Sequence, residues 1–257
     1  MSAETLWVAY CTIVNKEVGR FLRIWMQTIL PPAVSMTLYF IIFGSLIGPR
    51  IGEMSGFTYM DFIAPGIIMM SIINNAYANV VSSFFGAKLQ RHIEEMLVAP
   101  IPSWLLLAGY ITGGVARGLA VGVVVTVIAM FFTHLSVHHL PLVFVVVLMT
   151  SILFSLGGLI NAVHAKKFDD ISIIPTFVLT PLIYLGGVFY SINLLPEFWQ
   201  HVSRFNPILY MVNAFRYALL GVSDIHVGSA LAVTTVFIVA LTAYALYLLE
   251  RGTGIKT

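Results

Sequence analysis

The sequence predicts an all-α integral membrane protein that crosses the bilayer six times. Of its 257 residues, 59% are hydrophobic and only 9% are charged, and the mean hydropathy is +0.96. An ordinary soluble domain has about 25% charged residues, so a chain this apolar needs lipid around it. The apolar residues also form runs long enough to cross a bilayer. We therefore expect a single transmembrane domain over residues 1–257 and no soluble catalytic domain.

Charge and cysteine content exclude several classes of protein. The net charge of +2 comes from basic residues beside the predicted crossings, which makes them topology signals and not a nucleic-acid surface. Cys11 is the single cysteine, which excludes an intramolecular disulfide and a metal cluster built on cysteines. Residues 1–20 lack the basic start and apolar core of a cleavable signal, so we expect the mature chain to start near Met1.

Residues 1–21 predict a helix that lies in the plane of the lipid headgroups. Apolar residues recur there at helical spacing, whereas Lys16, Glu17 and Arg20 fall on the opposite side. This interfacial helix should rest on the membrane and not cross it.

Six apolar segments predict the crossings. They occupy residues 24–47, 58–86, 104–132, 141–164, 171–190 and 229–249. Pro31 and Pro32 are expected to kink the first segment or delay its helical start, and Pro65 is a candidate break near the start of the second. The second segment is longer than the roughly 20 residues that a bilayer requires, so it must tilt or protrude.

Two stretches between the predicted crossings differ from them, one in its charge and the other in its prolines. Residues 87–103 hold the densest charge in the chain and end at two prolines, which predicts a cytoplasmic loop containing a short helix. That helix could be held by a soluble partner or could rest on the headgroups. Residues 192–220 are apolar but are interrupted by Pro196 and by Asn206-Pro207. They predict two short helices that dip into the membrane from outside, a re-entrant helical hairpin.

The basic residues predict the orientation of the chain. One side of a six-crossing topology carries nine of them: Lys16, Arg20, Arg23, Lys88, Arg91, Lys166, Lys167, Arg251 and Lys256. The other side carries Arg50, Arg204 and Arg216. The richer side is expected to be cytoplasmic, with both termini on it.

Motifs for catalysis are missing from the sequence. It has no Gly-x-Ser-x-Gly, Ser-x-x-Lys or His-Glu-x-x-His pattern, and no Gly-x-x-x-x-Gly-Lys-Ser/Thr phosphate loop. We expect no catalytic residue, and any work driven by ATP would need a partner. His134 and His138 are four residues apart, but we interpret them as part of a solvated turn and not as metal ligands.

Polar residues inside the crossings are the candidate functional residues. Asn74, Asn75 and Asn79 in the second crossing could line a polar path or tie helices together. Arg117 in the third crossing must reach water, a carboxylate or the headgroups, or else contact a substrate. Around it lie glycines at spacings that let another helix approach, either from this chain or from a second copy: Gly109, Gly113, Gly114, Gly118 and Gly122.

Several short motifs together resemble the ABC-2 type permeases, the membrane subunits of a class of ATP-driven exporters, and are similar to its YadH-like branch. The resemblance covers nearly the whole chain. It rests on Arg23-Ile-Trp25 with Pro31-Pro32, Ser83-Phe-Phe-Gly86, Arg91-His-Ile-Glu-Glu95, Pro100-Ile-Pro102, Phe168-Asp-Asp170, Pro175-Thr-Phe177, Tyr184-Leu-Gly-Gly-Val-Phe-Tyr190 and Asn206-Pro207 through Arg216-Tyr217.

The resemblance implies a homodimer in the inner membrane that works with two copies of a separate ABC ATPase subunit. ATP and Mg would be bound by that ATPase, and this chain would hold no cofactor. The resemblance further implies that 87–103 is a coupling loop, in which Arg91, Glu94 and Glu95 would dock the ATPase. It names no substrate.

The alternative function is an ATP-independent channel or secondary carrier. Such proteins more typically show charged relay residues or repeat symmetry, and neither feature is evident in this sequence.

Overall fold

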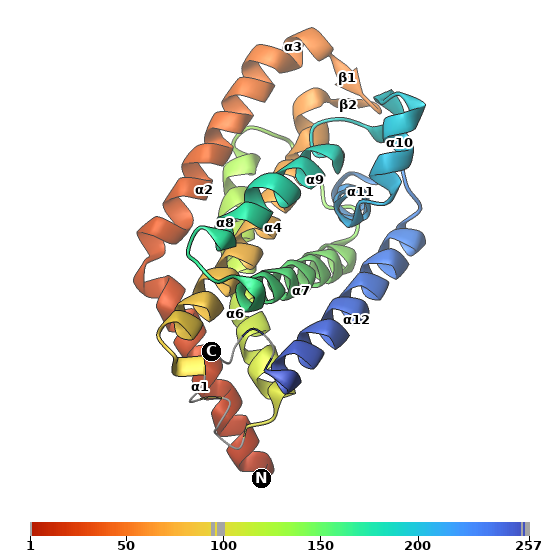
Figure 1. Ribbon diagram of the computed structural model, residues 1–257. Coiled ribbons are helices and arrows are strands. Elements are labelled where there is room, and N and C mark those ends of the chain that lie inside the picture. The colour runs from red at the N-terminus through yellow and green to blue at the C-terminus, as the bar shows by residue number, and fades with distance from the viewer. Residues whose placement is uncertain (1, 94–95, 97–100, 253, 255–257) are drawn as a thin grey trace.

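The computed structural model describes residues 2–93, 96, 101–252 and 254, and these residues are almost entirely helical. Figure 1 shows long helices gathered into one bundle, with short helices and a small hairpin at one end. The helices are α1 (Ala3–Arg23), α2 (Trp25–Tyr39), η1 (Phe40–Ile47), α3 (Gly48–Ile51), α4 (Tyr59–Leu89), α6 (Ser103–Met130), α7 (Leu140–His164), α8 (Asp170–Ile174), η2 (Pro175–Leu179), α9 (Thr180–Leu185), η3 (Ile192–Leu194), α10 (Glu197–Arg204), α11 (Pro207–Leu220) and α12 (Val227–Arg251). The strands β1 (Glu53–Met54) and β2 (Phe57–Thr58) pair antiparallel.

Five helices in the described part of the chain are long and apolar enough to cross a membrane. They are Trp25–Ile51, Tyr59–Leu89, Ser103–Met130, Leu140–His164 and Val227–Arg251. Their bounds lie close to those of five predicted crossings. The predicted segment 171–190 is different, because the apolar helix there covers only Asp170–Leu185 and the chain is then irregular.

The prolines have less effect than the sequence predicts. Pro31 and Pro32 lie inside a helix that begins at Trp25 without delay, and the chain bends instead at Ile24, where φ is −108° and ψ is 36°. The interruption predicted at Pro65 is wrong, because α4 is a continuous helix of 31 residues around it. Pro65 is the seventh residue of α4, so it removes one backbone hydrogen bond near the helix start, and the remaining bonds hold the helix.

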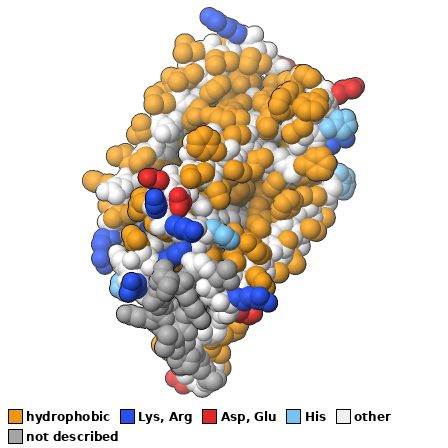
Figure 2. All heavy atoms as spheres, in the orientation of Figure 1, with side chains coloured by type: hydrophobic (Ala, Val, Ile, Leu, Met, Phe, Trp, Pro, Cys, Tyr) orange, Lys and Arg blue, Asp and Glu red, His pale blue; other side chains and the backbone are white. Residues whose placement is uncertain are grey.

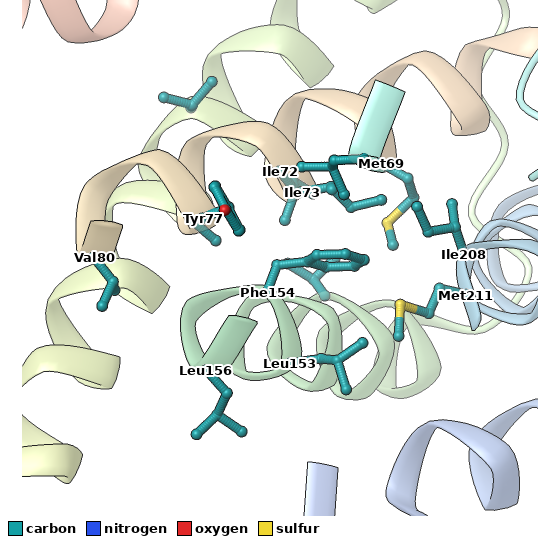
Figure 3. Close-up of a cluster of buried hydrophobic side chains, with 14 of the residues drawn as sticks. Met69, Ile72, Ile73, Tyr77, Val80, Leu153, Phe154, Leu156, Ile208 and Met211 are labelled. Atoms are coloured by element: carbon teal, nitrogen blue, oxygen red, sulfur yellow. The ribbon is translucent and has the colours of Figure 1, made fainter. Parts of the chain in front are cut away.

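Helix α4 is the centre of the bundle. In its most apolar window 78% of the residues are buried, against 11% in Trp25–Ile51 and 17% in Val227–Arg251. Its most extensive contacts are with α7 and α6, and α11 packs against both α4 and α7. Figure 3 shows the ring of Phe154 from α7 lying among Met69 and Ile73 of α4 and Met211 of α11.

The glycines of α6 are contact points with helices of the same chain. A side chain at Gly109 would meet Ile13 of α1, and one at Gly114 would meet Ser155 of α7. A side chain at Gly122 would meet Ile72 of α4. The small-residue face of α6 therefore serves packing within the chain.

The end of the bundle opposite the chain termini is held by a buried cation. Arg216 of α11 is 1% exposed, and its guanidinium lies 4.0 Å from the ring centroid of Phe62. It donates to the carbonyl oxygens of Phe62 at 3.3 Å and Gly187 at 2.6 Å. Arg216 thus joins α11, α4 and the loop after α9. From the sequence, it was interpreted as a basic residue of the outer side.

The surface has an apolar belt. Figure 2 shows hydrophobic side chains over α2, α9 and α12, with charged side chains at the rim and in the lower part of this face. Exposed apolar residues along α2 include Met26, Leu30 and Val34. A surface of this kind is stable against lipid tails.

Substituting Gly158 should destabilise the fold because its backbone touches that of α4. A methyl group there would lie 2.6 Å from the Tyr77 carbonyl oxygen and 3.2 Å from the Val81 amide nitrogen. We expect Gly158→Ala to cost about 1–3 kcal/mol, as overpacking does. The control is Gly86→Ala, which meets nothing within 4 Å and should gain up to about 1 kcal/mol of helix propensity. Thermal unfolding in detergent measures both, and equal melting temperatures would contradict the packing described.

Candidate functional site

The 87–103 segment begins inside the last turn of α4, which ends at Leu89. Arg91 is exposed, has a left-handed φ of 61°, and its amide donates to the Lys88 carbonyl at 3.0 Å. Ile93 is fully buried, whereas Leu89 is 64% exposed. Glu94 and Glu95 lie outside the residues that the structure describes. The described part of this segment is therefore anchored by the buried side chains of Ala87 and Ile93 and presents Arg91 to solvent.

The three asparagines of α4 lie in different environments. Asn74 is half-buried, and its amide donates to the Met70 carbonyl at 3.0 Å. Asn75 and Asn79 are buried against neighbouring helices. The sequence grouped these residues together, but the structure gives only Asn74 an accessible surface.

Arg117 of α6 pairs with one of these amides. Its guanidinium donates to Asn75 Oδ1 at 3.2 Å, while Asn75 Nδ2 donates to the Ser71 carbonyl at 3.0 Å. The partner of Arg117 is thus an amide of the same chain, which links α6 to α4.

Asn79 belongs to a cluster that fastens α1 to α4. Arg20 donates to Asn79 Oδ1 at 2.8 Å and to the Asn79 carbonyl at 2.9 Å. Ser83 donates to Glu17 Oε1 at 2.7 Å, and Arg20 Nε lies 3.7 Å from Glu17 Oε2. We call Glu17, Arg20, Asn79 and Ser83 the α1–α4 polar cluster.

Glu17 is on the buried side of α1, and its placement on the exposed side was wrong. The carboxylate is 0% exposed, and Ile13 and Phe21 on the same face are also buried. A side chain at Gly113 of α6 would meet Glu17 Cβ at 2.5 Å, so this glycine leaves the room that Glu17 occupies. The serine and arginine partners stabilise this buried carboxylate.

A groove runs beside α4 on the side of α8 and η2. Its volume is about 450 Å³. Its lining combines amide, hydroxyl, aromatic and apolar groups from Asn74, Tyr77, Ala78, Val81, Ser82, Phe168, Asp169, Ile171, Ser172, Pro175 and Thr176. Among the predicted site residues that the structure describes, Asn74 is the one that faces this groove.

The histidines of the turn between α6 and α7 take part in packing. The His134 amide donates to Asp61 Oδ1 at 3.0 Å, and the ring of His138 lies 5.7 Å from that of Tyr217. Within the described residues, no three His, Cys, Asp or Glu side chains are placed to hold a metal ion.

Comparisons with known proteins give consistent similarities. The family model for the ABC-2 type transporter matches residues 8–220. Over 251 residues, 98% of each chain, the sequence is 59% identical to the inner membrane transport permease YadH of Escherichia coli strain K12. It is 21% identical over 235 residues to nodulation protein J of Rhizobium meliloti strain 1021, with 87% of this chain and 90% of the relative covered. The range matched by the family model includes the α1–α4 polar cluster, the groove and the 87–103 segment.

The buried carboxyl of Glu17 should make stability depend on pH. Burial raises the pKa of Glu17 above its ordinary value of 4.5, and this outweighs the opposing effects of the Ser83 hydrogen bond and the Arg20 charge. The folded state then binds more protons than the unfolded state, so the free energy of unfolding falls as pH rises from about 4.5 towards the raised pKa. We expect the melting temperature to fall over this range more steeply for the wild type than for Glu17→Gln.

The matched control is Glu4→Gln, on the exposed side of the same helix. Its pH profile in detergent should follow the wild type. Parallel profiles for the wild type and Glu17→Gln would show that Glu17 does not titrate differently on folding.

Proposed function

Since the chain belongs to the ABC-2 type transporter family, we propose that it is the permease subunit of an ATP-driven exporter, working as a homodimer with two copies of a separate ATPase. The ATPase would bind and hydrolyse ATP with Mg, and this chain would be no enzyme. The similarity to a protein named as an inner membrane transport permease supports a location in the inner membrane.

The proposed topology has six crossings, with Asp170–Leu185 as the fifth. This helix has 16 residues and is apolar. The α4 end, the α7 end and α12 meet at one end of the bundle, where Lys88 contacts Ala165 and His164 contacts Tyr244. An even number of crossings puts α1 and the chain end after α12 on the same side, and the basic residues favour the cytoplasm. In this topology, α10 and α11 form the re-entrant hairpin on the outer side.

One observation carries the proposed mechanism: α4 runs without a break from the groove to the 87–103 segment. Asn74, Tyr77 and Ser82 line the groove, and the segment begins within three turns of Ser82. A displacement of the segment by the ATPase would therefore move the groove wall as a nearly rigid body. We assign ATPase docking to Arg91, Glu94 and Glu95.

The groove is the proposed half of the translocation path, and a second copy of the chain would supply the other half. Its mixed lining offers hydrogen bonds from Asn74, Ser172 and Thr176 beside the ring of Phe168. Asn75, Asn79 and Arg117 would act in this scheme by holding α4 to its neighbours.

Docking can be tested by co-expressing the chain with its candidate ATPase and purifying through a tag on the permease. We expect an ATPase to co-purify and to show vanadate-sensitive turnover in lipid. The double variant Glu94→Ala/Glu95→Ala should lower both, because it removes two charges from the docking segment.

The matched control is Glu53→Ala/Glu197→Ala, which removes two carboxylates from the opposite end of the bundle and should leave turnover unchanged. If no ATPase binds and the purified chain alone moves solutes down a gradient, the protein is a channel or carrier.

The path assignment can be tested by cysteine labelling in a Cys11→Ser background. Asn74→Cys should react readily with a maleimide, because its side chain faces the groove, and trapping with Mg-ATP and vanadate should change its rate. Ala76→Cys, two residues away and fully buried, should react slowly in both states. An Asn74→Cys rate that trapping leaves unaltered would argue against the groove as the path.

A further inference from the structure

The last turn of α7 is capped by a side chain from α4. The Lys88 ammonium donates to the carbonyl oxygens of Val163 at 2.6 Å, Ala165 at 2.7 Å and Ala162 at 3.5 Å. Carbonyls in the last turn of a helix have no partner within it, and a cation there also interacts favourably with the helix dipole. Lys88 therefore completes α7 as a C-cap would, but from another helix.

Lys88 also lies where α4 leads into the exposed part of the 87–103 segment. It is the second-to-last residue of α4, and three residues later the chain turns at Arg91 with its left-handed φ of 61°. Among the described hydrogen bonds between α4 and α7, those of Lys88 are the nearest in sequence to the exposed part of the 87–103 segment. Lys88 is thus a direct polar link between the last turn of α4 and the last turn of α7.

Further from the end of α4, the contacts between α4 and α7 are made by a side-chain amide and by closely approaching backbones. Asn161 donates to the Tyr77 hydroxyl at 2.7 Å, and Gly158 brings the two backbones together about three turns of α4 before its end. On the other side of α4, the α1–α4 polar cluster ends at Ser83. Among the described hydrogen bonds between the two helices, those of Lys88 lie nearest to the end of each helix.

We propose that Lys88 is a positioning residue that makes the cytoplasmic end of α7 follow α4 when the 87–103 segment is displaced. The inference rests on the proposed function, because the ATPase is the partner that displaces the segment. A side chain of similar length without donors, as in Lys88→Met, breaks this link and leaves the apolar contacts between the helices in place.

The test uses spin labels on the permease–ATPase complex in lipid, in a Cys11→Ser background. One pair, Leu89→Cys with Lys166→Cys on a chain that is co-assembled with an excess of unlabelled Cys11→Ser copies, reports the distance between the ends of α4 and α7 within a chain. A second sample with Leu89→Cys alone reports the distance between the α4 ends of the two copies. Pulsed EPR measures both without nucleotide and after trapping with Mg-ATP and vanadate.

With Lys88 intact, trapping should change the distance between copies and leave the distance within the chain constant. In Lys88→Met, the distance within the chain should change on trapping while ATP hydrolysis persists. Lys88→Arg should behave as the unaltered protein. Lys88→Gln keeps one donor group and is measured as well, in case the Met variant does not fold.

A constant distance within the chain in both Lys88→Met and Lys88→Gln would overturn the inference, as would a change in the protein with Lys88 intact. In both of these results the ATPase still binds and turns over. Failure of any ATPase to co-purify with the intact protein is a separate result, which removes the proposed function and the inference with it.

Discussion

Close approach of helix backbones at small residues is the constraint on which the rest of this bundle depends. Lipid tails are as apolar as the helices they surround, so helices associate through packing and polar contacts and not by escaping water. Gly114 and Gly158 bring α6 and α7 against their neighbours, and Gly113 leaves the space that Glu17 fills. If these positions were larger, α1 could not reach α4, and the polar cluster between them could not form.

The polar contacts divide the bundle into a fastened part and a free part. Amides, hydroxyls and charged groups join α1, α4, α6 and α7 towards the end where α4 leads into the 87–103 segment. In contrast, α2 and α12 present most of their surface to the surroundings. A movement imposed on α4 would thereby be shared by the helices that these polar contacts join to it.

The sequence was a good guide to the helices that cross the membrane and a poor guide to their polar partners. Hydropathy predicts the crossings because a bilayer requires length and apolarity, which are local properties. It overestimated the length of the helix after Asp170. Apolar residues continue past Leu185, but the helix ends at Gly186. Asn75 was expected to line a polar path or tie helices together, and Arg117 to need a partner or water, but their pairing depends on the rotation of two helices about their axes.

The partners of Glu17 and Lys88 could not be predicted for a related reason. From the sequence, Glu17 was grouped with its charged neighbours Lys16 and Arg20, although its spacing of four residues from Ile13 and Phe21 puts it on their buried face. Lys88 lies in a stretch that marks topology by its charge, and its bonds to α7 join residues more than 70 positions apart. Contacts of this range carry no local signature.

The buried position of Glu17 also sets an order of events during synthesis. Its hydrogen-bond partner Ser83 lies 66 residues downstream, and Gly113, which makes room for it, lies in α6, the helix that follows the 87–103 segment. When α1 leaves the ribosome, neither has been made, and a carboxylate that has only Arg20 beside it stays in water. Helix α1 must therefore wait at the membrane surface while α2, α4 and α6 are inserted, and it docks only once the nascent chain has supplied the pocket.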